Sequence, residues 1–279
     1  MMPTANFRCF ARSFITSLSY FPLVSPMLPH DVFCVIRELG FSSTRPTWRT
    51  YRAGKQVKRE RALKRFLPLG HVNARSIRNK TALIQHHIES LDLDVLTITE
   101  IRAKDALDGD DHLLRACPPG YFFLHTARDK SKGGGVAIIH RSTIGVAGSK
   151  AASECRSFSS FEFVCVMLCD HSIYIDLLVI YRPPLHSISL FLEEFTSLLE
   201  RLASSTTKTI IVGDFNIHLD QDKSFPEEFS SLIGSFGWIQ HADGPTHIGG
   251  HTLDLVISRA ADNLVASCTV AGFFSDLVE

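Results

Sequence analysis

The chain has 279 residues, of which 45% are hydrophobic and 21% are charged. A chain of this length forms one or two domains, and its hydrophobic content excludes disorder throughout. The absence of any run of about 18 uncharged apolar residues excludes a membrane-spanning helix. The seven cysteines form no CxxC pair. This argues against a disulfide scaffold or a structural zinc site and favours an intracellular protein with reduced thiols.

The net charge of zero is unevenly distributed along the chain. Residues 1–66 hold 12 Lys and Arg against three acidic residues, a net charge of +9, and the rest of the chain carries −9. This asymmetry predicts a basic segment attached to an acidic globular domain.

Residues 1–44 show no clear periodicity and fit neither a secretory signal nor a mitochondrial presequence. We expect a poorly ordered extension there, followed by a basic linker over 45–66. Nine of the residues from 45 to 65 are Lys or Arg, and Glu60 is the single acid among them. Two interpretations stay open for this basic segment, residues 45–65. It is a solvated linker, or it binds DNA phosphates without sequence preference.

From residue 67 to 279 the pattern becomes regular and predicts one folded domain. Apolar runs of strand length cover Leu93–Ile98, Val136–Ile139, Ile173–Ile180, Thr209–Val212 and Leu253–Ile257. Three amphipathic helices are expected between them, around residues 83–91, 191–202 and 229–236. Strands mixed with helices indicate an α/β or α+β domain.

Polar residues stand where the extended runs end. They are Asn73, Glu100, Tyr181, Asp214, Asn216 and Asp254. In sheet domains covered by helices, strand ends and the loops after them gather in one crevice. Because oxygen ligands suit Mg²⁺, several carboxylates in that crevice predict a site for a hard cation.

The most specific element is the sequence Gly213-Asp214-Phe215-Asn216, which follows an apolar strand directly. Residues two apart in an extended chain project to the same side, so Asp214 and Asn216 are expected at the mouth of the same crevice. The carboxylate can accept a proton or hold a water molecule, while the amide contacts a phosphate.

Two further motifs have simpler interpretations. No Gly-Lys-Ser/Thr follows Gly133-Gly134-Gly135, so these glycines predict a tight turn into the next strand and not a phosphate-binding loop. His247 and His251 flank a Gly-Gly pair, which predicts loop histidines in solvent, not zinc ligands on a helix.

Several segments occur in the order found in a known family. They are VNARSIRNK (72–80), LDVLTITE (93–100), KGGGVAII (132–139), VIYRPP (179–184), IIVGDFNIH (210–218), PTHIGGHTLDLVIS (245–258) and FSD (274–276). On these residues the domain resembles the endonuclease/exonuclease/phosphatase superfamily, which includes deoxyribonuclease I. Within it, the domain is most similar to the apurinic-type endonuclease domain of non-LTR (LINE-type) retrotransposons.

The resemblance implies a deoxyribonuclease I-like fold of the α/β (α+β) class. This is a four-layered sandwich, in which two mixed β-sheets pack together and helices cover the outside. It also implies a cofactor, Mg²⁺ or alternatively Mn²⁺, held by Glu100 with Asn73 and Asp276. No small-molecule cofactor is expected.

The resemblance also implies a role for each remaining site residue. Asp214 would orient or deprotonate the attacking water, and Asn216 would hold the scissile phosphate. Tyr181 would form a hydrogen bond with that phosphate in the transition state. Thr246 would contact substrate, and Asp254 would orient a catalytic imidazole.

The sequence departs from the family pattern at the closing Ser-Asp-His motif. Ser275, a substrate contact by resemblance, and Asp276 are present, but Leu277 follows where the motif has histidine. We therefore expect a truncated final strand and an incomplete C-terminal edge of the domain. Loss of a catalytic group such as this histidine typically lowers the rate of the catalysed reaction by about 10²–10⁴.

These observations predict a Mg²⁺-dependent endonuclease domain of retrotransposon origin that nicks DNA by phosphodiester hydrolysis, with activity impaired by the missing histidine. Two alternatives stay open: a catalytically dead DNA-binding remnant, and another phosphoesterase of the same superfamily. We expect DNA as the partner, no membrane contact, a monomer and a location in the nucleus.

Overall fold

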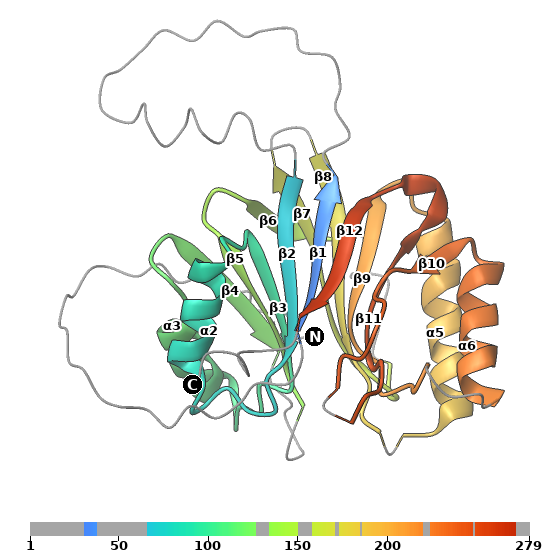
Figure 1. Ribbon diagram of the computed structural model, residues 1–279, viewed down its shortest axis with the longest axis horizontal. Helices are drawn as coiled ribbons and strands as arrows, with labels where there is room; N and C mark the ends of the chain where they lie inside the picture. The colour runs from blue at the N-terminus through green and yellow to red at the C-terminus, as the bar shows by residue number, and fades with distance from the viewer. Residues whose placement is uncertain are drawn as a thin grey trace, which may run out of the picture.

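The computed structural model describes residues 31–37, 66–126, 134–149, 158–170, 173–184, 186–219, 224–247 and 249–271. Figure 1 shows strands at the centre and helices at both flanks. Within these residues, no helix combines the length and apolar character needed to cross a membrane.

Twelve strands form two six-stranded sheets in the described chain. In spatial order, the first sheet contains β12 (Val265–Ala271), β1 (Asp31–Arg37), β2 (Phe66–Asn73), β3 (Val95–Thr99), β5 (Val136–Arg141) and β4 (Tyr121–Thr126). The second contains β10 (Trp238–Gln240), β11 (Asp254–Arg259), β9 (Lys208–Asp214), β8 (Ile173–Tyr181), β7 (Glu162–Asp170) and β6 (Gly145–Gly148). One pair in each sheet is parallel, β2 with β3 and β8 with β9, and the other pairs are antiparallel. Both sheets are therefore mixed.

The helices lie on the outer faces of the sheets (Figure 1). Helices α2 (Thr81–Ser90) and α3 (Ala106–Ala116) pack on the first sheet, and α5 (Ile188–Ala203) and α6 (Ser224–Ser235) on the second. A short 3₁₀ turn, η1 (Ala260–Asp262), joins β11 to β12. The predicted four-layered sandwich and its deoxyribonuclease I-like class are confirmed.

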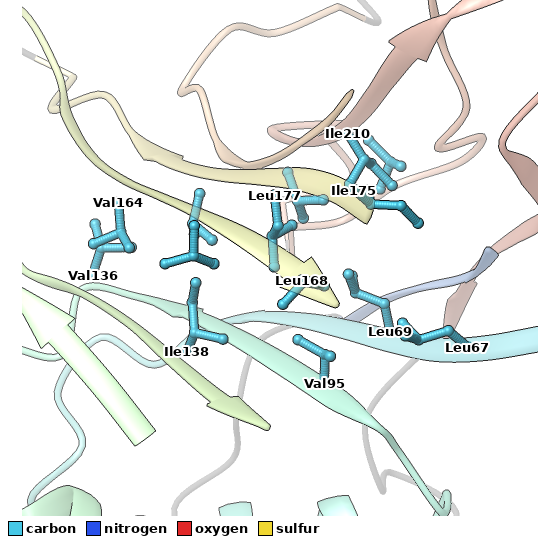
Figure 2. Packing of buried hydrophobic residues seen from close by; sticks show 14 of the residues in the cluster. Leu67, Leu69, Val95, Val136, Ile138, Val164, Leu168, Ile175, Leu177 and Ile210 are labelled. Carbon is cyan, nitrogen blue, oxygen red and sulfur yellow. The ribbon is translucent and has the colours of Figure 1, made fainter. Parts of the chain in front are cut away.

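The central core fills the space between the two sheets. Figure 2 shows Leu69, Val95 and Ile138 of the first sheet facing Leu168 and Leu177 of the second. Burial of each such side chain contributes roughly 1.5–3 kcal/mol to folding. This packing fixes the two sheets relative to each other, and therefore also the strand ends that carry polar residues.

Strand β9 illustrates why the apolar runs in the sequence predict strands. Ile210 and Val212 belong to the core between the sheets, while Ile211 belongs to the core beneath α5 and α6. Because both faces of the strand are covered there, residues 210–212 are all apolar and form a continuous run. The five predicted strand runs correspond to β3, β5, β8, β9 and β11, and the three predicted helices to α2, α5 and α6.

The predicted domain boundary at residue 67 differs from the structure. Residues 31–37 lie within the expected poorly ordered extension, yet they form β1, which pairs with β12 on one side and β2 on the other. Hydrogen bonds to two neighbouring strands supply the order that the local pattern does not predict. The rest of the extension, the basic segment, and the predicted truncated strand after Ala271 lie outside the described residues.

Candidate active site

The polar residues predicted at the strand ends meet in one cleft. Asn73 ends β2, Glu100 follows β3, and Asp214 ends β9 directly opposite Asp254 at the start of β11. The cleft has a volume of about 70 Å³ and is lined by Asn73, Arg75, Glu100, Asp214, Asn216, Thr246, His247, Leu253 and Asp254. Since one water molecule needs about 10–15 Å³ of such space, the cleft accommodates a small group such as an ion or a phosphoryl group.

Asn73 joins the two sheets at the centre of this cleft. Its Nδ2 donates to Glu100 Oε1 at 3.1 Å and to Asp214 Oδ2 at 2.6 Å. Its Oδ1 accepts the backbone N–H of Arg75 at 3.0 Å. The amide therefore holds two carboxylates from different sheets in one place, with its nitrogen and not its oxygen facing them.

Glu100 occupies a constrained position on the wall formed by the first sheet. Its backbone has φ = 50°, in the left-handed region that non-glycine residues seldom adopt. Its Oε2 accepts from Arg102 Nε at 2.8 Å and from Arg102 Nη2. Arg102 pairs with one carboxylate oxygen while Asn73 binds the other, so the orientation of this predicted metal ligand is fixed from two sides.

Asp214 is the most perturbed acid of the site. Burial, followed by the charge of Asp254 and then that of Glu100, raises its pKa well above the usual 3.8, against the stabilising hydrogen bonds from Asn216 and Asn73. Raised carboxyl pKa values of this kind are typical of groups that exchange protons in catalysis. The mutual repulsion of the three carboxylates is also what a bound cation would relieve, so this oxygen-donor set fits Mg²⁺.

The loop after β9 presents Asp214 and Asn216 in a fixed arrangement. The backbone N–H of Asn216 donates to Asp214 Oδ1 at 3.0 Å, and Asn216 Nδ2 donates to the Arg182 carbonyl at 2.8 Å. The buried Arg182 guanidinium in turn donates to the carbonyls of Phe215, Asn216 and His186. Arg182 therefore anchors the loop. In the sequence, Arg182 stands out only as part of the VIYRPP motif, although its place next to a buried strand was a signal.

The side chains of Thr246 and Tyr181 mainly contact other parts of the protein around the cleft. Thr246 Oγ1 accepts the backbone N–H groups of Leu253 at 2.8 Å and Asp254 at 2.9 Å, so it braces the start of β11. Tyr181 ends β8 beside Asp214, with its side chain in the core between the sheets. Their predicted substrate contacts stay predictions. Ser275 and Asp276 lie outside the described residues.

Two histidines that contact residues of the cleft were not predicted as site residues. His247 lies on a loop as expected, but it lines the cleft instead of facing only solvent, and its Nε2 contacts Arg75. His71 stands two residues before Asn73 on β2 and therefore projects to the same side. That spacing was the only signal in the sequence for His71.

The glycine turn before β5 binds a protein carboxylate. Gly134 and Gly135 have φ values of 73° and 85°, and the Gly135 N–H donates to Glu162 Oε2 at 2.6 Å. Such positive φ values are what a turn into the strand would need, and Gly133 lies outside the described residues.

Among the described residues, no group of three or more His, Cys, Asp or Glu has the arrangement of a preformed metal centre.

A larger hollow of about 330 Å³ lies elsewhere, among residues of β4, β5, β6 and β7. Its lining is predominantly apolar and contains no carboxylate. The chemistry of the protein is therefore expected at the smaller cleft.

Comparisons with known proteins agree with this architecture. The endonuclease/exonuclease/phosphatase family model matches residues 70–276. The endonuclease domain of TRAS1, a telomere-specific non-LTR retrotransposon, has a similar structure, with a TM-score of 0.54 and 14% identity over 68% of this chain and 83% of that domain.

Two further solved structures are similar at lower scores. An AP endonuclease from Archaeoglobus fulgidus has a TM-score of 0.47 and 16% identity over 71% of this chain and 88% of its own. The 3′ phosphatase NExo from Neisseria has a TM-score of 0.48 and 14% identity over 70% and 87%. No curated protein sequence matches this one. From the family match and the observed fold, the chain belongs to the endonuclease/exonuclease/phosphatase family.

Proposed function

We propose that this chain is a Mg²⁺-dependent endonuclease domain of non-LTR retrotransposon type that nicks DNA by hydrolysing a phosphodiester. The observation that carries the proposal is the bridge from Asn73 to Glu100 and Asp214. It joins a candidate metal ligand and a candidate base from different sheets within one small cleft.

The cleft supports hydrolysis of a phosphodiester at the surface of a long substrate. Its volume of about 70 Å³ is below the ~300–1,000 Å³ of pockets that enclose a small-molecule ligand. A phosphoryl group can enter while the rest of a polymer stays outside. This favours a nucleic acid backbone over a small phosphate ester, the alternative within the same family.

Each residue then has a definite task. Glu100 and its carboxylate neighbours would hold Mg²⁺, which stabilises negative charge on the phosphate. Asp214 accepts the proton of the attacking water, and the backbone N–H of Asn216 keeps its carboxylate oriented. The P–O3′ bond breaks as the new P–O bond forms, and the departing 3′ oxygen takes a proton from solvent.

A supercoiled-plasmid nicking assay on the full chain tests this proposal. The full chain is needed because β1 belongs to the first sheet. We expect nicking that needs Mg²⁺, stops with EDTA, and falls by about 10²–10⁴ in Glu100→Gln and in Asp214→Asn.

The matched control is Glu228→Gln, an exposed carboxylate on α6, which should nick like the wild type. Nicking that survives EDTA would contradict the metal assignment. DNA binding without nicking under any condition would favour the catalytically dead remnant. Hydrolysis of small phosphate esters in place of DNA would favour another phosphoesterase.

A further inference from the structure

Two basic side chains meet at the cleft from opposite sheets. Arg75 follows β2 of the first sheet, and His247 lies on the loop before β11 of the second sheet. Both line the cleft with the carboxylates, and Arg75 Nη2 contacts His247 Nε2. Neither residue has a role in the proposed hydrolysis, so their meeting needs its own explanation.

The backbone holds Arg75 firmly in this place. Arg75 and Ser76 have φ values of 48° and 116°, both unusual for residues with side chains. The N–H of Arg75 donates to Asn73 Oδ1, and the N–H of Ser76 donates to the Glu100 carbonyl at 2.9 Å. Strained backbone that its surroundings hold in place is characteristic of functional positions.

The hydrogen-bonding groups of the pair do not satisfy each other. His247 Nδ1 faces the Gly249 N–H at 3.1 Å, and Nε2 faces the guanidinium of Arg75. A neutral imidazole has one acceptor nitrogen and a protonated one has none. With Nδ1 accepting from Gly249, Nε2 carries its hydrogen and two donors face each other. An anionic oxygen would accept from both.

The Arg75 guanidinium has no carboxylate to neutralise it. Three carboxylates line the cleft with Arg75, but Glu100 pairs with Arg102, and Arg75 has no carboxylate partner within ion-pair distance among the described residues. An anion that enters beside the carboxylates would therefore find this guanidinium available.

We propose that Arg75 and His247 form a phosphate-binding pair, in which the guanidinium and Nε2–H donate to oxygens of one substrate phosphate. Charge-assisted hydrogen bonds of this type suit arginine, whose planar fork matches the geometry of phosphate. The pair stands beside the carboxylates, so it would seat the phosphodiester against them. This inference rests on the proposed function for the identity of its substrate.

Binding of a short DNA duplex to the full chain in EDTA tests the pair without turnover. We expect Arg75→Gln to weaken binding about tenfold or more and to lower the slope of log K against log salt by about 0.9, the value for one phosphate contact. Arg75→Lys should retain the slope because it keeps the charge. The control is Arg78→Gln, which removes an exposed arginine of the same loop that pairs with Asp108.

For His247, we expect His247→Ala to raise KM with a smaller effect on kcat, and His247→Gln, which keeps an N–H at a similar reach, to restore much of the loss. If inorganic phosphate competes with the duplex for the wild type, and competes less well for Arg75→Gln, the pair binds phosphate itself. Competition by DNA alone would assign it to phosphate within a polynucleotide.

The inference is overturned if Arg75→Gln and Arg78→Gln change the DNA affinity and the salt slope equally. Both variants must keep the circular dichroism spectrum and the Tm of the wild type for this comparison. The two proposals fail separately. A chain that never nicks but shows the Arg75 effect contradicts only the proposed hydrolysis. A chain that nicks but shows no Arg75 effect contradicts only the phosphate-binding pair.

Discussion

His71 Nε2 lies 3.2 Å from Asp254 Oδ1, so a fully buried imidazole of the first sheet faces a carboxylate of the second. Its Nδ1 contacts Thr97 Oγ1 at 2.9 Å, and that hydroxyl donates to the Gly70 carbonyl at 3.1 Å. Since a carbonyl only accepts, Thr97 must accept from Nδ1–H. The other ring nitrogen, Nε2, faces the Asp254 carboxylate. The family resemblance implied an imidazole partner for Asp254 near the C-terminus, and β2 supplies a different one.

Replacing His71 should affect stability and turnover together. We expect His71→Leu to lower the free energy of unfolding by about 1–3 kcal/mol, because Asp254 is left buried without a partner. It should also reduce kcat with little change in KM. His71→Gln, whose amide can still donate to Asp254, should recover part of both losses. Urea unfolding and nicking kinetics measure the two effects, and a stable, fully active His71→Leu protein would contradict this role.

Asp214 should make stability depend on pH in an unusual direction. The unfolded chain loses the Asp214 proton near pH 3.8, whereas the folded chain keeps it to higher pH because burial and neighbouring charges raise the pKa. Between these values the folded state binds more protons, so the free energy of unfolding falls as pH rises.

The variant Asp214→Asn has no titrating group at this position, so its free energy of unfolding should not fall in this way as pH rises. At neutral pH it is expected to be more stable than the wild type while losing nicking activity. Urea unfolding of both proteins in EDTA, from pH 4 to 8, gives the comparison. Parallel stability curves for the two proteins would show that Asp214 does not cause the pH dependence.

Gly213 should be irreplaceable in the strand that delivers Asp214. A Cβ atom at this position would lie 1.9 Å from the Ile180 carbonyl oxygen, one residue before the end of the β8–β9 pair. We expect Gly213→Ala to destabilise the fold by about 3 kcal/mol or more, since backbone must move to make room. Gly234→Ala on α6, where no atom lies within 4 Å of the added Cβ, is the control. It should stabilise by up to about 1 kcal/mol, as measured by thermal unfolding.

Three residues of the site were predictable because each lies at the end of an extended segment. Glu100 and Asp214 close apolar runs that are visible in the sequence, and Asn73 closes β2, which pairs in parallel with the strand before Glu100. Local pattern was sufficient there because strands buried on both faces leave a clear signal.

The residues that sequence reasoning missed depend on distant partners. Arg182 is held by carbonyls more than 30 residues away, and His71 by a carboxylate 183 residues away. Strand β1 is likewise ordered by β12, from the other end of the described chain. No local period encodes such contacts, so these features emerge only from the three-dimensional arrangement.

The basic segment is expected to contribute non-specific DNA affinity. Replacing its nine Lys and Arg residues with Gln should flatten the slope of log K against log salt, because fewer counterions are released on binding. This variant retains β1, which deletion of residues 1–66 would remove along with the charges. Filter binding of duplex DNA over a range of salt concentrations measures the slope. An unchanged slope would identify the segment as a linker.

The pairing of β1 with β2 also fixes where the chain leaves the first sheet and where it returns. Arg37 and Phe66 are register partners, so the ends of β1 and β2 that flank residues 38–65 lie side by side. Asn73 closes β2 at its other end, about 23–25 Å further along the extended strand. The chain therefore leaves and re-enters the sheet at the end of β2 that is opposite to the cleft. A DNA molecule that reaches both this point and the cleft must extend along the length of that strand.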